Sequence, residues 1–259
     1  MPSTSLKGFR RGRSSPYALK YELARSALDG GTDSASKVLV NNRDNDFLRF
    51  DIQSGRRPSR SRDKAGEFYL MGTAIRQLQS AKQDAGELET FSRDDELAVL
   101  DERIRRLKLA GGGPPEGWME TRNRLEGVAA TPALTAPVVA HRDLHYGQWL
   151  LHGGRGSLLD FDLPSLAEPE LDPANFLSHL SLRRLQHPAL ISTEDEKACR
   201  QAFLEGLALP GNRDSRTRLD FYQATTFARL ALVYQLRPRW RDIGPGLLDL
   251  GNQCLRKLA

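Results

Sequence analysis

Residues 138–180 read VVAHRDLHYGQWLLHGGRGSLLDFDLPSLAEPELDPANFLSHL, and this stretch decides the fold. Two short apolar runs flank a polar segment that extends from His141 to Gln148. A third apolar run leads directly into Asp160 and Asp162. Short apolar runs bounded by polar residues predict buried strands. Polar groups carried between such strands indicate an active-site loop on a rigid support.

The composition narrows the class of protein. A chain of 259 residues with 39% hydrophobic and 27% charged residues is expected to form one sizeable soluble domain or two small ones. No apolar run approaches the roughly 20 residues that span a bilayer, and the N-terminal residues lack the apolar core of a signal peptide. The two cysteines, Cys199 and Cys254, have no metal-ligand spacing. We therefore expect a cytoplasmic protein without a transmembrane segment.

The positive charge of the chain is concentrated near its N-terminus. The net charge is +5, and residues 1–64 contain 14 Lys and Arg against 7 Asp and Glu. An Arg-rich segment suits nucleic acid, a membrane surface or a polyphosphate ligand, and it is equally compatible with a solvated loop. No zinc finger, RNA-binding aromatic motif or basic heptad accompanies the charge. We therefore expect no nucleic-acid partner.

The periodicity of the apolar residues divides the chain into two parts. Residues 1–62 predict a small α/β lobe, and residues 63–259 predict a larger, mostly helical one. The elements predicted in the first part are a strand at 4–9, a helix at 17–28 and strands at 37–40 and 47–52. The helices predicted outside the central stretch are 68–79, 94–109, 118–125, 194–207, 217–235 and 245–258. The expected fold class is α+β.

The central stretch contains the parts of a phosphoryl-transfer site. His141-Arg142-Asp143, with Gln148 five residues after Asp143, follows the kinase catalytic-loop pattern H-R-D-x-x-x-x-N, with a longer amide in the last place. Phosphoryl transfer to a hydroxyl needs a carboxylate near the hydroxyl proton and oxygen ligands for the Mg²⁺ that bridges the phosphates. Asp143, Gln148 and Asp160 supply this set.

These motifs resemble the aminoglycoside phosphotransferase and choline kinase-like family, which consists of small-molecule kinases with a protein-kinase-like fold. In that family the loop reads H-x-D-x-x-x-x-N, as it does here apart from Gln148. The metal-binding Asp opens a short segment of the type L-D-F, found here at 159–161. A later D-x-A is found here at 172–174. The three motifs occur in the family's order and at similar spacing.

The resemblance implies roles for individual residues. It assigns Asp143 as the catalytic base and Gln148 and Asp160 as Mg²⁺ ligands. It assigns His141 and Asp172 as structural supports of the loop. It also implies ATP and Mg²⁺ as cofactors, a small-molecule hydroxyl as the acceptor, and a two-lobe fold with a helical C-terminal lobe.

Ahead of the central stretch the resemblance is thinner. Kinase-like folds pair a strand Lys, which contacts the phosphates, with a helix Glu that orients it. Lys7 and Glu22 lie in suitable strand and helix patterns, and we assign both to nucleotide binding. The alternative, Lys37, leaves too little chain before the next long helix for the rest of a lobe. Because almost nothing precedes Lys7, we expect either a chain that starts late or a reduced N-terminal lobe.

Two other functions remain open. A chain with a reduced lobe would also suit a pseudokinase or a nucleotide-binding partner module. A metallohydrolase would instead gather His and Asp donors around two metal ions. Those donors would be His141, Asp143, His145, Asp160, Asp162 and His179. Gln148 and the 172–174 segment have no role in such a site, and Asp162 suits either a second metal ion or a structural position.

The acceptor is expected to bind to the helical part, between residues 217 and 240, where aromatic and charged side chains mix. The candidates are Asp220, Tyr222, Arg229, Tyr234 and Arg237. The same side chains would also suit the faces of packed helices. Aminoglycosides are polycations and need an acidic cleft, which this segment does not indicate. A hydroxyl on a sugar, an amino alcohol or a lipid-linked glycan fits, and the oligomeric state is left open.

Overall fold

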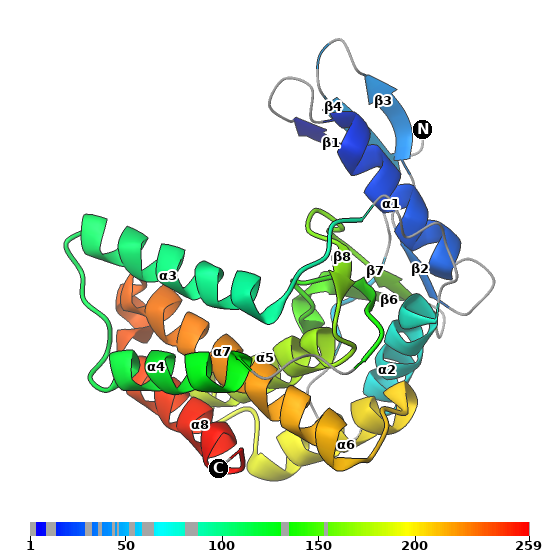
Figure 1. The fold of residues 1–259 in the computed structure, drawn as a ribbon. Helices are drawn as coiled ribbons and strands as arrows, with labels where there is room; N and C mark the ends of the chain where they lie inside the picture. The colour runs from blue at the N-terminus through cyan, green and yellow to red at the C-terminus, as the bar shows by residue number, and fades with distance from the viewer. Residues whose placement is uncertain are drawn as a thin grey trace. The chain divides into compact units, whose positions relative to one another are not determined.

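The computed structural model of the protein describes residues 4–8, 14–28, 33–35, 38–42, 45, 47–51, 55–58, 65–80, 88–130, 135–152 and 155–258 (Figure 1). The chain forms two compact units. The first comprises residues 1–89, 138–166 and 197–208, and the second comprises 90–137, 167–196 and 209–259. Most of the central stretch thus belongs to the same unit as the N-terminal segment. The boundary at residue 62 stays a prediction, and Lys37 lies outside the described residues.

Three small sheets contain the described strands. The strands are β1 (Thr4–Gly8), β2 (Asp33–Ala35), β3 (Val38–Asn42), β4 (Phe47–Asp51), β5 (Val138–Ala140), β6 (Trp149–His152), β7 (Arg155–Leu158) and β8 (Ser165–Ala167). The first sheet has the order β1-β4-β3, with β4 antiparallel to both neighbours. In the second sheet β2 is parallel to β7, and β7 is antiparallel to β6. The third sheet pairs β5 with β8.

Helix α1 (Ser14–Leu28) contacts β2 and β3, as well as α2 (Ala65–Gln79). Its buried residues Ala18, Tyr21, Ala24 and Leu28 are three or four positions apart, so they share one side of the helix. The helix predicted at 17–28 is confirmed and begins at Ser14. This face of α1 turns inward, whereas Leu19, which the spacing of Leu19, Leu23 and Ala27 would have placed on the apolar side, is 41% exposed.

Helix α2 approaches α6 (Thr193–Leu207) closely at two glycines. A Cβ on Gly72 would lie 2.1 Å from the carbonyl oxygen of Phe203, and a Cβ on Gly206 would lie 2.0 Å from that of Tyr69. Both distances are far below van der Waals contact. Glycine at these positions therefore allows the two backbones to touch inside the first unit.

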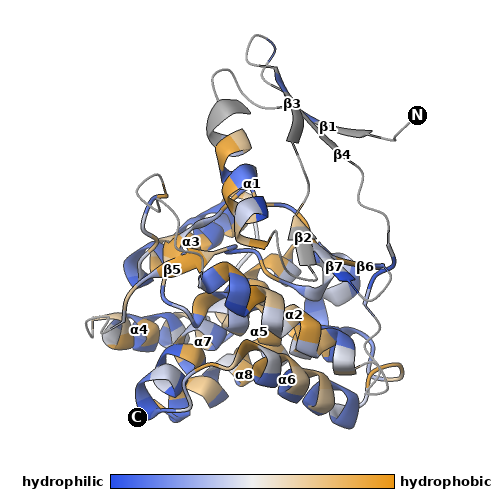
Figure 2. Cartoon of the chain, turned by 90° about the vertical axis from the view of Figure 1, so that its right-hand side faces the viewer, coloured by the Kyte–Doolittle hydropathy of each residue, from blue (hydrophilic) through white to orange (hydrophobic). Residues whose placement is uncertain are grey.

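The second unit is built from helices around α7 (Figure 1). Its helices are α3 (Arg93–Leu109), α4 (Trp118–Ala129), α5 (Leu171–Gln186), α7 (Arg213–Gln235) and α8 (Gly244–Arg256). Helix α7 packs against the other four, and the indole nitrogen of Trp118 donates to the carbonyl of Ala228 at 2.9 Å. Hydrophilic and hydrophobic residues alternate along these helices (Figure 2). Some polar side chains of this unit, including Glu168, Glu170 and Arg218, are buried and need partners, which the buried ion pairs described below provide.

The structure is helix-rich with small sheets, and the six helices predicted outside the central stretch are all confirmed, with shifts of a few residues at their ends. The strands β2 and β8 were not predicted, because their sequences, DSA and SLA, contain no apolar run of the kind that marks β5. Among the described residues, no helix has the length and apolar character needed to cross a membrane.

Candidate active site

The loop 141–148 follows β5 and is anchored by buried apolar residues. Val139 and Ala140 are buried in β5, and Leu144 is buried within the loop. Arg142 has a φ of 69°, in the left-handed region that non-glycine residues seldom adopt. Asp143 lies between these anchors and is partly exposed. The buried neighbours thus hold an unfavourable backbone and leave the Asp143 carboxylate accessible.

His141 braces this loop through both ring nitrogens. The side chain is fully buried; its Nε2 donates to the carbonyl of Leu159 at 2.8 Å, and its Nδ1 accepts from the amide of Asp143 at 3.3 Å. This tautomer follows from the partners, since a carbonyl only accepts and an amide only donates. The ring also packs edge-on against Phe161, with centroids 4.8 Å apart. His141 therefore ties Asp143 to the segment that carries Asp160.

Leu159 completes this connection with its backbone. Its amide donates to the carbonyl of Gln148 at 2.9 Å, while its own carbonyl accepts from His141. The side-chain Nε2 of Gln148 reaches Oδ2 of Asp143 at 3.5 Å, the outer limit of a hydrogen bond. Asp143, Gln148 and Asp160 are therefore held in one frame.

Beyond Leu159, two carboxylates share one ammonium group. Lys7 Nζ donates to Oδ1 of Asp160 at 2.9 Å and to Oδ2 of Asp162. The hydroxyl of Tyr21 donates to the other oxygen of Asp162 at 3.1 Å. Asp160 has a φ of 63°, again in the left-handed region. We call Lys7, Tyr21, Asp160 and Asp162 the Lys7 cluster.

Burial and attraction compete in the Lys7 cluster. Burial acts to lower the pKa of Lys7, but hydrogen bonds to Asp162 and Asp160, and their charges, raise it above its ordinary value. Burial acts to raise the pKa of Asp160, but the hydrogen bond and charge of Lys7 lower it. The pKa of Tyr21 is raised, first by burial and then by the negative charges of Asp162 and Asp160. These shifts favour a charged ammonium at Lys7, an ionised carboxylate at Asp160 and a neutral phenol at Tyr21.

His145 shapes the turn that carries Gln148. Its Nδ1 accepts from the amide of Gly147 at 3.0 Å and so caps the 3₁₀ helix η3 (Tyr146–Gln148). A Cβ on Gly147 would lie 2.7 Å from Cε1 of the His145 ring, so this position leaves no room for a side chain. Burial lowers the pKa of His145, although the charge of Asp143 acts to raise it. A neutral His145 keeps Nδ1 free to accept the bond.

The structure places the predicted site residues unequally. His141, Asp143, Gln148, Asp160 and Lys7 come together in the first unit through the contacts described above. Among the described contacts, Glu22 binds Arg25 on the same helix at 3.3 Å rather than Lys7. The assignment of Glu22 to nucleotide binding stays a prediction. Asp172 is fully buried in the first turn of α5, in the second unit, and its supporting role also stays a prediction.

The sequence motifs do not include Tyr21. The apolar pattern of the sequence gives no signal for it, and only the structure shows that Tyr21 shares the buried helix face with Ala18 and Leu28. A buried tyrosine hydroxyl needs a hydrogen-bond partner. Periodicity alone, however, does not reveal that the partner is Asp162.

The donor chemistry fits the predicted Mg²⁺ site. Asp160 and Asp162 each give one carboxylate oxygen to the same cationic group. The side-chain nitrogen of Gln148 turns toward Asp143, which leaves its oxygen for another partner. Carboxylate and amide oxygens are ligands of the kind that Mg²⁺ takes. Asp160 and Gln148 are therefore suited to hold the ion.

The donor set of a metallohydrolase is not assembled in the described part of the chain. Within those residues, no three His, Cys, Asp or Glu side chains are grouped so that they could hold a metal ion. Both ring nitrogens of His141 are engaged by the backbone. The geometry gives this alternative no support.

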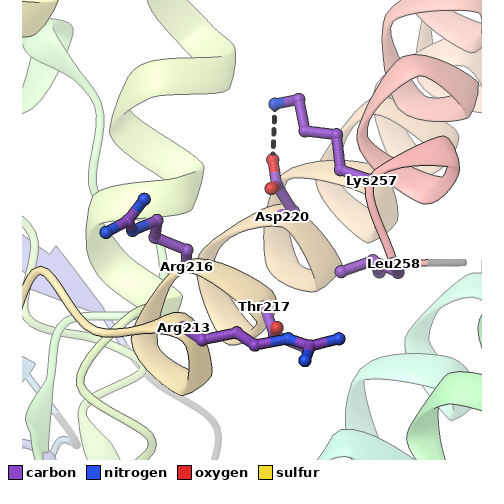
Figure 3. A pocket seen from close by; sticks show the side chains of 6 residues that line it. All are labelled: Arg213, Arg216, Thr217, Asp220, Lys257 and Leu258. Atoms are coloured by element: carbon purple, nitrogen blue, oxygen red, sulfur yellow. Dashed lines mark hydrogen bonds and ion pairs between the residues drawn. The ribbon is translucent and has the colours of Figure 1, made fainter.

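A cavity of about 350 Å³ lies on the second unit, between the first turns of α7 and the end of α8 (Figure 3). Its lining residues are Arg213, Arg216, Thr217, Asp220, Lys257 and Leu258. Asp220 accepts from Lys257 at 2.8 Å, and Arg216 donates to the carbonyl of Gly211 at 2.9 Å. With three cations and one carboxylate, the lining is not the acidic cleft that a polycation needs.

The other acceptor candidates take part in helix packing. Tyr222 is buried and donates to Oε2 of Glu168 at 2.8 Å. Arg229 donates to Oδ1 of Asn175 at 2.7 Å, and the guanidinium of Arg237 lies over the ring of Tyr234. A role of these side chains in acceptor binding stays a prediction.

Comparison with known proteins agrees with the motifs. The model of the phosphotransferase enzyme family matches residues 26–221, more than half of the chain. Among solved structures, a putative aminoglycoside phosphotransferase from Ralstonia eutropha JMP134 has a TM-score of 0.71 at 15% identity, covering 98% of this chain and 86% of that chain. A choline kinase from Cryptosporidium parvum Iowa II has a TM-score of 0.68 at 10% identity, covering 98% and 82%.

An amicoumacin kinase in complex with AMP-PNP, Ca²⁺ and Ami has a TM-score of 0.67 at 15% identity, covering 98% of this chain and 81% of that chain. At these identities the likeness shows a shared fold. No curated protein matches the sequence significantly.

Proposed function

The chain belongs to the phosphotransferase enzyme family, and from this premise we propose that it is an ATP-dependent kinase that phosphorylates a hydroxyl group of a small molecule. The observation that carries the proposal is the backbone of Leu159. It binds His141 and Gln148, and so holds the expected base, Asp143, beside the expected metal ligand, Asp160. A base and a metal ligand held in one frame are what phosphoryl transfer requires.

The proposal gives each of these residues a role. Asp143 is accessible and orients the acceptor hydroxyl, from which it takes the proton. Asp160 and Gln148 hold Mg²⁺, which offsets negative charge on the phosphates. Lys7 supplies a further positive charge toward the phosphates. His141 has no free ring nitrogen and acts by bracing the loop.

The nucleotide-binding lobe in this proposal is the segment 1–62, with β1, β3, β4 and α1, followed by a helical lobe at 63–259. The boundary at residue 62 rests on the sequence pattern, whereas the compact units of the structure group residues 1–89 with 138–166 and 197–208. Whether the first lobe is reduced relative to the kinases of similar fold stays a prediction. The alternative is a pseudokinase or nucleotide-binding module, in which the same residues bind without transferring phosphate.

Nucleotide binding is tested by thermal unfolding with and without Mg·ATP. A ligand at 100 times its dissociation constant stabilises a protein by about 2.7 kcal/mol, so the unfolding midpoint of the wild type should rise. Asp160→Ala should lose most of this rise, whereas Asp249→Asn, an acidic control on α8, should keep it. No rise at millimolar Mg·ATP would refute the kinase proposal.

Catalysis is tested by an ATP-consumption screen over hydroxylated metabolites, including choline, ethanolamine and aminoglycosides, with Asp143→Asn as the blank. Loss of the base should cut turnover by about 10²–10⁴-fold. Nucleotide affinity should stay near the wild-type value, because Asp143 faces the acceptor. A comparable loss of nucleotide affinity would show that the role is misassigned. Nucleotide binding without turnover on any acceptor would favour the pseudokinase.

A further inference from the structure

Helix α1 meets the Lys7 cluster through Tyr21 and not through Glu22. The Tyr21 side chain is 3% exposed, and its hydroxyl bonds to Asp162 at 3.1 Å. The Glu22 side chain is 44% exposed and binds Arg25 at 3.3 Å. Lys7, in turn, binds Asp160 and Asp162. The link from the helix to Lys7 therefore passes through a phenol and a carboxylate.

The phase of the helix explains this difference. Consecutive residues of an α-helix point about 100° apart, so Tyr21 and Glu22 do not face the same neighbour. The buried face of α1 carries Ala18, Tyr21 and Leu28. The rotation that buries this apolar stripe turns Glu22 away from the cluster.

We propose that Tyr21 and Asp162 are the positioning residues of Lys7, with Tyr21 fixing the Asp162 carboxylate and Asp162 fixing the ammonium group next to Asp160. The inference rests on the proposed function, in which Lys7 faces the phosphates of the nucleotide. It assigns to this pair the task that a helix glutamate performs in other kinases.

The contacts of Asp162 support this role. Its Oδ1 accepts from Tyr21 and its Oδ2 from Lys7, so each oxygen has a different partner. A carboxylate held at one oxygen only can still rotate about its terminal torsion, which is broad. The bond from Tyr21 removes that freedom and thereby restricts where Lys7 can lie.

The same helix residue also reaches the loop 141–148. The ring of Tyr21 packs edge-on against Phe161, with centroids 6.1 Å apart. Phe161 is fully buried and packs edge-on against His141 at 4.8 Å. Tyr21 thus contacts both the carboxylate that holds Lys7 and the aromatic pair that braces Asp143. The substitution Tyr21→Phe separates the two contacts, because it removes the hydrogen bond to Asp162 and keeps the ring that packs against Phe161.

The first test measures the dissociation constant of Mg·AMP-PNP by calorimetry for the wild type and for Tyr21→Phe. Loss of a hydrogen bond to a charged group should weaken binding about tenfold. Tyr17→Phe, on the same helix and outside the cluster, is the matched control and should bind as the wild type does. Glu22→Gln should weaken binding less than Tyr21→Phe. Equal or greater weakening by Glu22→Gln would overturn the proposal.

A double-mutant cycle separates positioning from general structural damage. If Tyr21 acts through Lys7, Tyr21→Phe should have no further effect on Mg·AMP-PNP binding when Lys7 is already methionine. If the two losses instead add, Tyr21 does not act through Lys7 and the proposal fails. The midpoint of thermal unfolding, measured on the same variants, shows whether folding is affected separately.

If the wild type binds no nucleotide, the proposed kinase function fails. The positioning of Lys7 by Tyr21 and Asp162 can still be tested by a measurement that needs no nucleotide. Acetic anhydride at low extent acylates lysines, and mass spectrometry of peptides reports the rate at Lys7 relative to Lys257. Lys257 is an exposed lysine paired with Asp220. Tyr21→Phe and Asp162→Asn should each raise the relative rate at Lys7, because its ion pairs loosen. Unchanged labelling of Lys7 in both variants would overturn the proposal.

Discussion

Ion pairs occur in both units, but they are built differently. In the second unit Arg218 binds Glu170 through two bonds of 2.8 and 3.0 Å, and Arg93 binds Glu168 in the same way. These side chains are at most 10% exposed. In the first unit one ammonium, that of Lys7, is shared by Asp160 and Asp162, and the three side chains are 28 to 44% exposed.

The difference separates structural charge from charge that can bind a ligand. A planar guanidinium matches both oxygens of a carboxylate and fixes its plane. The hydroxyls of Ser215 and Tyr222 donate to the same two glutamates, so the carboxylate oxygens of Glu170 and Glu168 are already engaged within the protein. An ammonium is a compact charge on a flexible stem. In the proposed function, Lys7 would exchange a carboxylate for a phosphate without disturbing a buried ion pair.

The largest loss of stability is expected when a buried ion pair of the second unit is broken. Arg218→Met leaves the Glu170 carboxylate buried without its ionic partner, and we expect a loss of about 3–5 kcal/mol in the free energy of unfolding, measured by denaturant titration. Arg106→Met, which removes an exposed partner of Glu102, is the control and should leave the midpoint unchanged. A variant at Arg218 with wild-type stability would show that the buried pair does not hold the helices.

An intermediate effect is expected where the first unit relies on backbone packing rather than charge. Gly206→Ala places a methyl group 2.0 Å from the carbonyl oxygen of Tyr69, so α2 and α6 must separate. We expect a loss of about 1–3 kcal/mol in the free energy of unfolding. Gly127→Ala is the control, because its methyl group meets nothing within 4 Å and should raise stability by up to about 1 kcal/mol. Equal effects of the two changes would contradict the close approach of the helices.

The smallest expected effect is a pH dependence at His145, whose pKa is lowered first by burial and also by Arg57 and the neighbouring His141, and is raised by the charges of Asp143 and Asp160. Below its ordinary pKa near 6.5 the unfolded chain binds the proton more readily than the folded protein. Stability should therefore fall as the pH drops from about 6.5 toward the lowered folded-state pKa, by at most about 1.4 kcal/mol per pH unit.

Thermal unfolding between pH 7.5 and 5 measures this slope for the wild type and for His145→Asn. Asparagine keeps an acceptor for the amide of Gly147 but does not titrate. The slope should be smaller in the variant. An identical slope in both proteins would assign the pH dependence to another group.

Much of the fold could be predicted because it depends on local spacing. The apolar stripes of α2 and α3 indicated helices close to their observed places, and the pattern of His141, Asp143 and Gln148 indicated a loop between short strands. The two-unit arrangement could not be predicted, since it places residues 138–166 with residues 1–89 across a long helical insertion. No local pattern reports such a contact.

The sequence by itself determined which chemistry the chain carries: a carboxylate at Asp143, oxygen donors at Gln148 and Asp160, and a basic residue at Lys7. Only the tertiary structure decided which groups meet. Motif order favoured Glu22 as the partner of Lys7, but the buried stripe sets the rotation of α1 and turns Tyr21 toward the cluster. More than 140 residues separate Tyr21 from Asp162. Their hydrogen bond depends on how α1 is rotated about its axis relative to the segment that follows β7. This rotation is set by tertiary packing and not by residue spacing along the chain.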